Sequence, residues 1–257
     1  FACYDLASVK TEGFGVTTNR PKEAHYRSPG APPAVYAVES LIDELSQELG
    51  LDPLEVRLIN AARKGTVASY GPTFNDIGLE AILHKIREHP HYLAPLQENQ
   101  ARGLACGFWF NFGGDTSVSL SINADGTATV VEGNPDIGGS RASISMMAAE
   151  ELDIPYEDVR TTIADTGSLG FNNVTDGSRV TFAVGLATIN AARAVKAEMC
   201  ARVAKIWGID EDAVEWVDGC VTPAGPNAGE FPPMTLAEIA AVSSQTGGPI
   251  AGHHEVN

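Results

Sequence analysis

Three short segments of this sequence combine glycine or serine with arginine, and each directly precedes a predicted helix. Glycine lets a ligand approach the backbone closely, arginine adds a planar pair of charged donors, and a helix N-terminus presents unpaired N–H groups. Taken singly, each segment is an ordinary helix cap. Together they favour an anionic cofactor, whose identity composition and spacing leave open. The segments are residues 26–30 (Tyr-Arg-Ser-Pro-Gly), 136–141 (Asp-Ile-Gly-Gly-Ser-Arg) and 176–179 (Asp-Gly-Ser-Arg).

A fourth candidate site is the run Asp165-Thr166-Gly167, which matches the aspartic-protease signature and follows a predicted strand. Aspartic-protease chemistry needs two carboxylates that share one proton. The chain has no second Asp-Thr-Gly or Asp-Ser-Gly run. An Asp/Gly turn after a strand is therefore the favoured interpretation, and the protease stays a rival hypothesis.

Several other kinds of site have no support in the sequence. There is no G-x-G-x-x-G run and no Walker lysine, and the histidine pairs His89/His91 and His253/His254 lack the i, i+4 spacing of a zinc enzyme. We predict no metal-ligating side chain. The formal charge of −16 and the pI near 4.6 exclude nucleic acid and an anionic membrane surface as partners.

The composition is that of a globular protein, with 44% hydrophobic and 19% charged residues in 257. No run of about 18–20 apolar residues occurs, and the four dispersed cysteines form no C-x-x-C pair. These features predict reduced thiols and a cytoplasmic location. Because the chain begins with Phe1 rather than Met, we expect a fragment or one piece of a split polypeptide.

The elements that must position these segments differ between the two halves of the chain. In the first half we expect a strand at 14–18, a helix from Pro32 to Leu49 with one apolar stripe, a helix capped by Asp52, and a short helix from Asp76. The stripe consists of Val35, Val38, Ile42, Leu45 and Leu49, and Glu39, Asp43 and Glu44 form a solvated face beside it. Residues 88–101 are a predicted boundary.

The second half mixes strands and helices without the regular alternation of a doubly wound sheet, which predicts an α+β fold. The prediction comprises hairpins at 118–131 and 214–222, a strand at 159–163, helices at 140–152 and 178–207, and a last helix from Met234.

Longer runs of the sequence resemble the molybdopterin-binding large subunit of the xanthine dehydrogenase/aldehyde oxidase family, the molybdenum hydroxylases. In the first half the resemblance is carried by residues 26–33, 37–45 and 49–60, and in the second half by 103–105, 123–127, 136–138, 148–152, 165–166 and 177–179. It implies an α+β pair of partial domains. Residues 1–97 would be the C-terminal part of the first molybdopterin-binding domain, and residues 98–257 the N-terminal part of the second.

The resemblance also implies a function. Such enzymes use a molybdenum–pyranopterin cofactor (molybdopterin or its cytosine dinucleotide) to hydroxylate an aldehyde or an aromatic N-heterocycle with oxygen from water. Electrons would pass to iron–sulfur clusters and FAD on an iron–sulfur subunit and a flavin subunit. The remainder of the large subunit would be a further partner, and a non-catalytic cofactor-binding or assembly subunit is the second rival hypothesis.

The resemblance assigns a role to each of the three segments. Arg27 is the predicted catalytic residue, in a loop that would approach the molybdenum. The predicted cofactor-binding residues are Tyr26, Arg27, Ser28, Gly138, Gly139, Ser140, Arg141, Asp176, Gly177, Ser178 and Arg179.

This chain departs from the family pattern at several positions. Gly138-Gly139-Ser140 replaces the common Gly-Gln-Gly, so backbone donors would replace the glutamine contact. Pro29 stands where many members have a second aromatic residue, and Ser28 stands where carbon monoxide dehydrogenases have cysteine, which disfavours that activity. The glutamate that activates the metal hydroxide is expected outside this chain.

Overall fold

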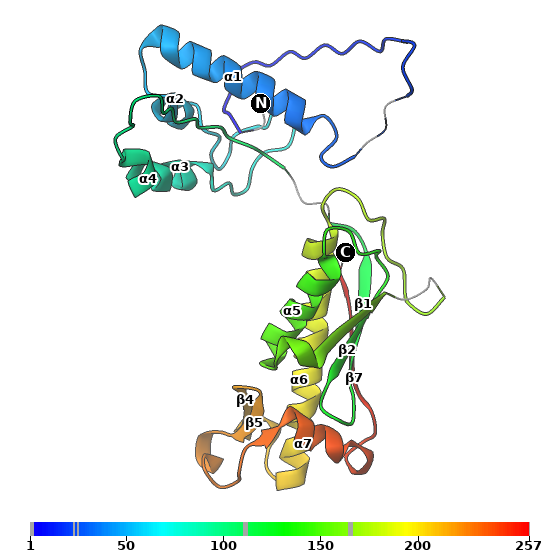
Figure 1. Cartoon of the computed structure of the whole chain (residues 1–257). Helices are drawn as coiled ribbons and strands as arrows, with labels where there is room; N and C mark the ends of the chain where they lie inside the picture. Colours follow the sequence, from blue (N-terminus) through cyan, green and yellow to red (C-terminus); the bar gives the residue numbers. More distant parts are fainter. Residues whose placement is uncertain (1–2, 23, 25, 110–112, 164–166, 257) are drawn as a thin grey trace. The chain divides into compact units, whose positions relative to one another are not determined.

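The computed structural model describes the chain except residues 1–2, 23, 25, 110–112, 164–166 and 257. It divides into two compact units, Phe1–Trp109 and Phe110–Asn257 (Figure 1). The domain boundary between residues 97 and 98 stays a prediction. Within the described residues, no helix is long and apolar enough to cross a membrane.

The first unit is built from helices whose ends follow from local sequence signals. Gly50, at φ 63°, ends the first helix in a left-handed conformation that suits glycine. Asp52 caps the second helix, because its carboxylate accepts the backbone N–H groups of Leu54 and Glu55 at 2.7 and 3.3 Å. The helices are α1 (Ala31–Leu49), α2 (Pro53–Ile59), α3 (Leu79–Glu88) and α4 (Pro90–Leu93).

The strand predicted at residues 14–18 does not form. Phe14 and Val16 are 85% and 77% exposed, and no β-ladder bond reaches them. A strand needs a partner for its N–H and C=O groups, and the described residues of this unit contain isolated bridges, such as Tyr4 with Ala61, but no ladder. Local apolar residues alone therefore did not make a strand.

The predicted apolar stripe of α1 is confirmed only in part: Val38 and Ile42 pack against the buried cluster of this unit, whereas Leu45 and Leu49 are about half exposed or more. The buried residues of α1 are Glu39 and Ser46. Glu39, expected on a solvated face, instead accepts hydrogen bonds from the Tyr4 hydroxyl at 2.6 Å and from the fully buried Arg57 at 2.9 Å. A buried cation thus holds the buried carboxylate, which no pattern within α1 reveals.

The second unit is centred on a four-stranded sheet in the order β3-β2-β1-β7 (Figure 1). β1 and β2 form the predicted hairpin, with Leu120 opposite Val130 and a turn in which Gly126 has φ 87°. α5 connects β2 to β3, which run parallel. The elements are β1 (Thr116–Ile122), β2 (Ala128–Glu132), α5 (Ser140–Leu152), β3 (Val159–Ile163), α6 (Gly185–Trp207) and β7 (Ile250–Val256).

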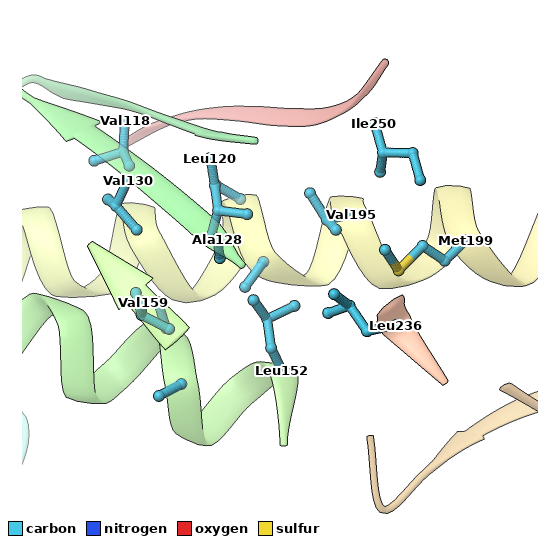
Figure 2. Packing of buried hydrophobic residues seen from close by; sticks show 14 of the residues in the cluster. Val118, Leu120, Ala128, Val130, Leu152, Val159, Val195, Met199, Leu236 and Ile250 are labelled. Carbon is cyan, nitrogen blue, oxygen red and sulfur yellow. The ribbon is translucent and has the colours of Figure 1, made fainter. Parts of the chain in front are cut away.

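The helices α5 and α6 cover one face of this sheet, and the hydrophobic core lies between the sheet and these two helices (Figure 2). Alternate strand residues such as Val118, Leu120 and Val130 are fully buried against Val195 and Met199 of α6. Every second residue of the strands points toward α6, and the residues on one face of α6 point toward the sheet. Together these side chains form one apolar layer.

A second, three-stranded sheet contains β4 (Val214–Val217), β5 (Cys220–Pro223) and β6 (Met234–Thr235), and α7 (Leu236–Ala241) follows with a capping box at Thr235. The long helix predicted from residue 178 begins instead as a π-helical segment, Val180–Val184, before α6. Short 3₁₀ turns lie at Tyr156–Asp158, Glu211–Ala213, Gly225–Asn227 and Ser243–Gln245. Helices and mixed sheets in this arrangement confirm the predicted α+β class.

Candidate functional site

The three predicted anion-binding segments share a backbone feature. Each contains two successive residues with positive φ a short distance before a helix begins. Left-handed backbone strains a residue that has a Cβ atom, and such strain concentrates at functional sites. The φ angles are 44° and 50° at Arg27 and Ser28, 72° and 84° at Gly138 and Gly139, and 62° at both Gly177 and Ser178.

The sheet topology brings two of these segments to one end of the second unit. Residues 133–139 follow the end of β2, and residues 170–179 lead into the π-helical segment and α6. Because β1 runs antiparallel to β2, the start of β1 lies at that same end. Hydrogen bonds join the segments there: the Asn134 side-chain amide donates to the Asn173 carbonyl and to the Thr175 hydroxyl, both at 2.9 Å.

Arg179 connects a third segment, residues 113–115, to this end of the second unit. Its side chain is almost fully buried and donates to the carbonyls of Gly113, Gly114 and Asp115 at 2.9–3.0 Å. It also donates to the carbonyls of Asn173 and Val174 at 2.9 and 3.5 Å. Burial lowers the pKa of Arg179 from its ordinary value. All five guanidinium N–H groups are used by backbone carbonyls, so Arg179 holds loops together and contributes charge without a donor to spare.

In the segment before α5, the carboxylate of Asp136 lies beside the first residues of the helix. Asp136 accepts long contacts from the Ser140 hydroxyl at 3.3 Å, the Arg141 backbone N–H at 3.4 Å and the Arg141 guanidinium at 3.5 Å. The Arg141 side chain remains 55% exposed. A Cβ atom built on Gly139 would meet nothing within 4 Å, so this side of the loop is open.

Asp176 has a similar local role in the next segment. Its carboxylate accepts the backbone N–H of Gly177 at 2.6 Å, while Ser178 is exposed. The donors that face outward in these two segments are therefore the Arg141 guanidinium and the Ser178 hydroxyl, beside the open Gly139. Such donors suit a phosphate group, whereas the two aspartates oppose it.

The segment of Tyr26, Arg27 and Ser28 belongs to the first unit. Tyr26 is 82% exposed, and Arg27 is exposed beside it. The backbone carbonyl of Ser28 accepts the Ala31 N–H at 3.0 Å, which closes the turn into α1. In the described part of the chain no hydrogen bond or ion pair is recorded for the Arg27 guanidinium, so this segment presents both side chains to solvent.

Two further kinds of possible site concern the protease-like run and metal-binding side chains. Asp165 and Thr166 of the protease-like run lie outside the described residues. Among the described residues, no group of three or more His, Cys, Asp or Glu side chains is placed to hold a metal ion.

Sequence reasoning missed two buried polar residues beside the site, Glu132 and Asn134. Glu132 is fully buried at the end of β2, and Asn134 is 2% exposed. A glutamate at the fifth position of an otherwise alternating strand was the available signal, because such a residue shares the core-facing side with Ala128 and Val130.

Comparison with known proteins identifies the family. Two models described as molybdopterin cofactor-binding domains match residues 93–256 and residues 1–61. The putative xanthine dehydrogenase molybdenum-binding subunit XdhA of Escherichia coli is 34% identical over 206 residues, which are 73% of this chain and 27% of that protein. An aldehyde oxidoreductase of Megalodesulfovibrio gigas is 29% identical over 195 residues, 69% of this chain and 21% of that protein.

A solved structure shares the fold. Quinoline 2-oxidoreductase from Pseudomonas putida 86 is 19% identical and superposes with a TM-score of 0.68 over 86% of this chain and 32% of that one. The chain thus spans about a quarter of the length of the curated relatives it matches. Because one family model covers more than half of the chain, the predicted resemblance is confirmed, and the chain belongs to the molybdopterin cofactor-binding family of molybdenum hydroxylase large subunits.

Proposed function

We propose that this chain is part of a molybdenum-cofactor oxidoreductase that hydroxylates an aldehyde or an aromatic N-heterocycle with oxygen from water. The observation that carries the proposal is the repeated backbone geometry, two successive left-handed residues shortly before a helix, at all three predicted segments. Backbone N–H groups in such turns form concave anion sites. Molybdopterin carries a phosphate, and the family match explains why three such turns occur in a chain with a net charge of −16.

The residues of the second unit fit a phosphate-bearing group. Arg141 and Ser178 would bind its oxygens, and the open side of Gly139 would let the group approach the backbone of the loop. Arg179 would not touch the bound group. Its donors hold the loops in place, and its buried positive charge favours an anion nearby. Asp136 would have to release its long contacts with Arg141.

The remaining predicted roles belong to the first unit. Tyr26, Arg27 and Ser28 would lie toward the reacting end of the cofactor, where the guanidinium of Arg27 would stabilise negative charge. When bound, the molybdenum cofactor supplies the centre that accepts two electrons from the substrate. The side chains of this chain bind and orient that group, and Arg27 is the one proposed catalytic residue.

The substrate classes follow from two relatives, whose names refer to xanthine, a fused N-heterocycle, and to an aldehyde. Because the chain spans about a quarter of these relatives, the proposed assembly includes the remainder of the large subunit. From the family resemblance alone, it also includes an iron–sulfur subunit with its clusters and a flavin subunit with FAD. Size-exclusion chromatography with light scattering should show this association, and an active species of only 27.1 kDa would contradict it.

Elemental and pterin analysis of the natively purified complex tests the cofactor assignment. We expect molybdenum and a pyranopterin, and a lower pyranopterin content after Arg141→Ala than after Arg160→Ala, which removes an exposed arginine from β3. Active, fully assembled protein without molybdenum would overturn the proposal. Equal pterin content in the two variants would remove Arg141 from the site.

A further inference from the structure

Two buried oxygen atoms next to the candidate site have no hydrogen-bond donor in the described part of the chain. Glu132 ends β2 and is fully buried, and its Oε2 accepts the backbone N–H of Asn134 at 2.6 Å. Among the described residues, the other carboxyl oxygen, Oε1, has no hydrogen-bond partner, nor does the side-chain oxygen Oδ1 of Asn134. Both atoms are shielded from solvent. Two unpaired acceptors within two residues are unusual, because buried polar atoms are nearly always paired.

Rotation of the Asn134 side-chain amide by half a turn would not give these two oxygens a donor. Its Nδ2 atom donates to the Asn173 carbonyl and to the Thr175 hydroxyl, and both bonds are 2.9 Å long. An exchanged amide would point an oxygen at the Asn173 carbonyl, which is also an acceptor. The side-chain oxygen of Asn134 therefore stays where it is and still needs a donor.

Among the described residues, no cation compensates a negative charge on Glu132. On the strand beside it, Arg160 is exposed while its neighbours Val159 and Thr161 are buried. The two arginines at the helix starts are used elsewhere, Arg141 on Asp136 and Arg179 on backbone carbonyls. The other titratable groups that the structure describes at this end of the sheet are the carboxylates Asp115, Asp136, Asp176 and Glu255 and the imidazoles of His253 and His254 on β7.

The surroundings of Glu132 accordingly favour its neutral form. Burial raises the pKa of Glu132 above its ordinary value of 4.5, and the negative charge of Asp136 raises it further. The N–H of Asn134 opposes this by lowering the pKa, and the net shift is upward. A neutral carboxyl group also brings the missing donor, since a protonated carboxyl carries one O–H.

We propose that Glu132 is protonated in the folded protein and donates its O–H to the side-chain oxygen of Asn134, so that acid and amide together fix the loops that bear the cofactor-binding residues. The proton comes from solvent, and no covalent bond changes. Through Asn134, Glu132 acts on residues 173–175, which also hold Arg179. Glu132 is thus a positioning residue. Its protonation is independent of the proposed function, and only its consequence for the cofactor rests on that function.

The first test detects the proton directly in the full chain. Infrared spectra at pH 7 should contain the carbonyl band of a protonated carboxyl group. The band should be absent from Glu132→Gln and present in the control Glu150→Gln, which changes an exposed glutamate of α5. A wild-type spectrum without this band, or a band that persists in Glu132→Gln, would overturn the proposal.

The second test separates positioning from simple packing. Glutamine has an N–H donor for Asn134 and an oxygen for the Asn134 backbone, so Glu132→Gln should keep wild-type hydrogen exchange in residues 133–139 and 172–178. Glu132→Ala, in contrast, should accelerate exchange there at least tenfold. If Glu132→Ala fails to fold, the Glu132→Gln spectrum and exchange still decide the question. Exchange in Glu132→Gln as fast as in an unfolded loop would overturn the positioning role.

The third test uses pH. A group whose pKa is raised by folding stabilises the protein fully at low pH and loses that contribution as pH rises through the folded-state pKa. The urea midpoint of the wild type should therefore fall relative to Glu132→Gln as pH rises from 4.5. A constant difference between pH 5 and 9 would contradict the proposal. Molybdenum content, measured separately, shows whether the proposed function fails independently.

Discussion

Substitution of Arg179 by alanine tests the claim that one buried guanidinium holds the end of the second unit together. Arg179 is 2% exposed and uses all of its donors on carbonyls from residues 113–115 and 173–174. These two stretches are about 60 residues apart in the sequence. We expect alanine to leave the carbonyls without donors and to release both stretches.

The expected loss in the free energy of unfolding is about 2–3 kcal/mol. A single hydrogen bond to a charged group contributes about 1.5–3 kcal/mol. Simple addition over five bonds overestimates the effect for two reasons. Gly113, Asp115 and Val174 are exposed enough for water to replace the donor, and removal of Arg179 also removes the cost of burying its charge. A loss of that size lowers the folding equilibrium constant roughly 30- to 150-fold.

Urea unfolding followed by tryptophan fluorescence measures this change, since Trp207 and Trp216 lie in the second unit. Arg179→Lys should recover less than half of the loss, because one ammonium group cannot reach carbonyls on two segments. The matched control, Arg160→Ala, removes an exposed arginine and should stay within about 0.5 kcal/mol of wild type. An Arg179→Ala protein as stable as this control, or a fully stable Arg179→Lys protein, would refute the reasoning.

Three further predictions concern the first unit. Arg27→Ala and Arg27→Lys should each lower turnover per bound molybdenum about 100-fold in the assembled enzyme, as expected for a lost transition-state donor, and wild-type turnover at full metal content would make Arg27 a surface residue. Glu39→Ala should cost about 3 kcal/mol in urea unfolding because buried Arg57 loses the buried one of its two carboxylate partners, whereas exposed Glu44→Ala should be nearly neutral. Burial raises the pKa of Cys3 to about 11, so iodoacetamide at pH 8 should label it only after unfolding, and rapid labelling of Cys3 in the native protein by peptide mapping would contradict this.

Elements with local signals were predicted closely. The helix at Ser140–Leu152 and the strand at Val159–Ile163 form with the predicted bounds. The glycine before α5 and the period of the following residues act over a few positions, so the sequence itself contains the reason for these elements. The three segments predicted to bind the cofactor were proposed in the same way, because Gly/Ser/Arg runs before helices need no knowledge of distant residues, and their binding role stays a prediction.

Elements that depend on distant partners were missed or placed wrongly. β7 pairs with β1 along seven residues, from Thr116 opposite Val256 to Ile122 opposite Ile250, and its sequence contains Gly and two histidines that give no strand signal. The strand expected at 14–18 had an apolar pattern but found no partner. In both places the pairing partner decides the outcome, and that partner lies far along the chain or is lacking.

The roles of charged side chains were decided by the tertiary structure. By itself the sequence determined the family resemblance, the α+β class and the residues that border the candidate site, because motifs and periodicities are local properties. Only the fold decided that Arg179 donates to backbone carbonyls and that Glu39 is buried against Arg57. It also decided that Glu132 has no compensating cation among the described residues. The sequence does not show the surroundings of a charged side chain. The energy of the charge depends on how far solvent is excluded and on which partners long-range packing brings near it.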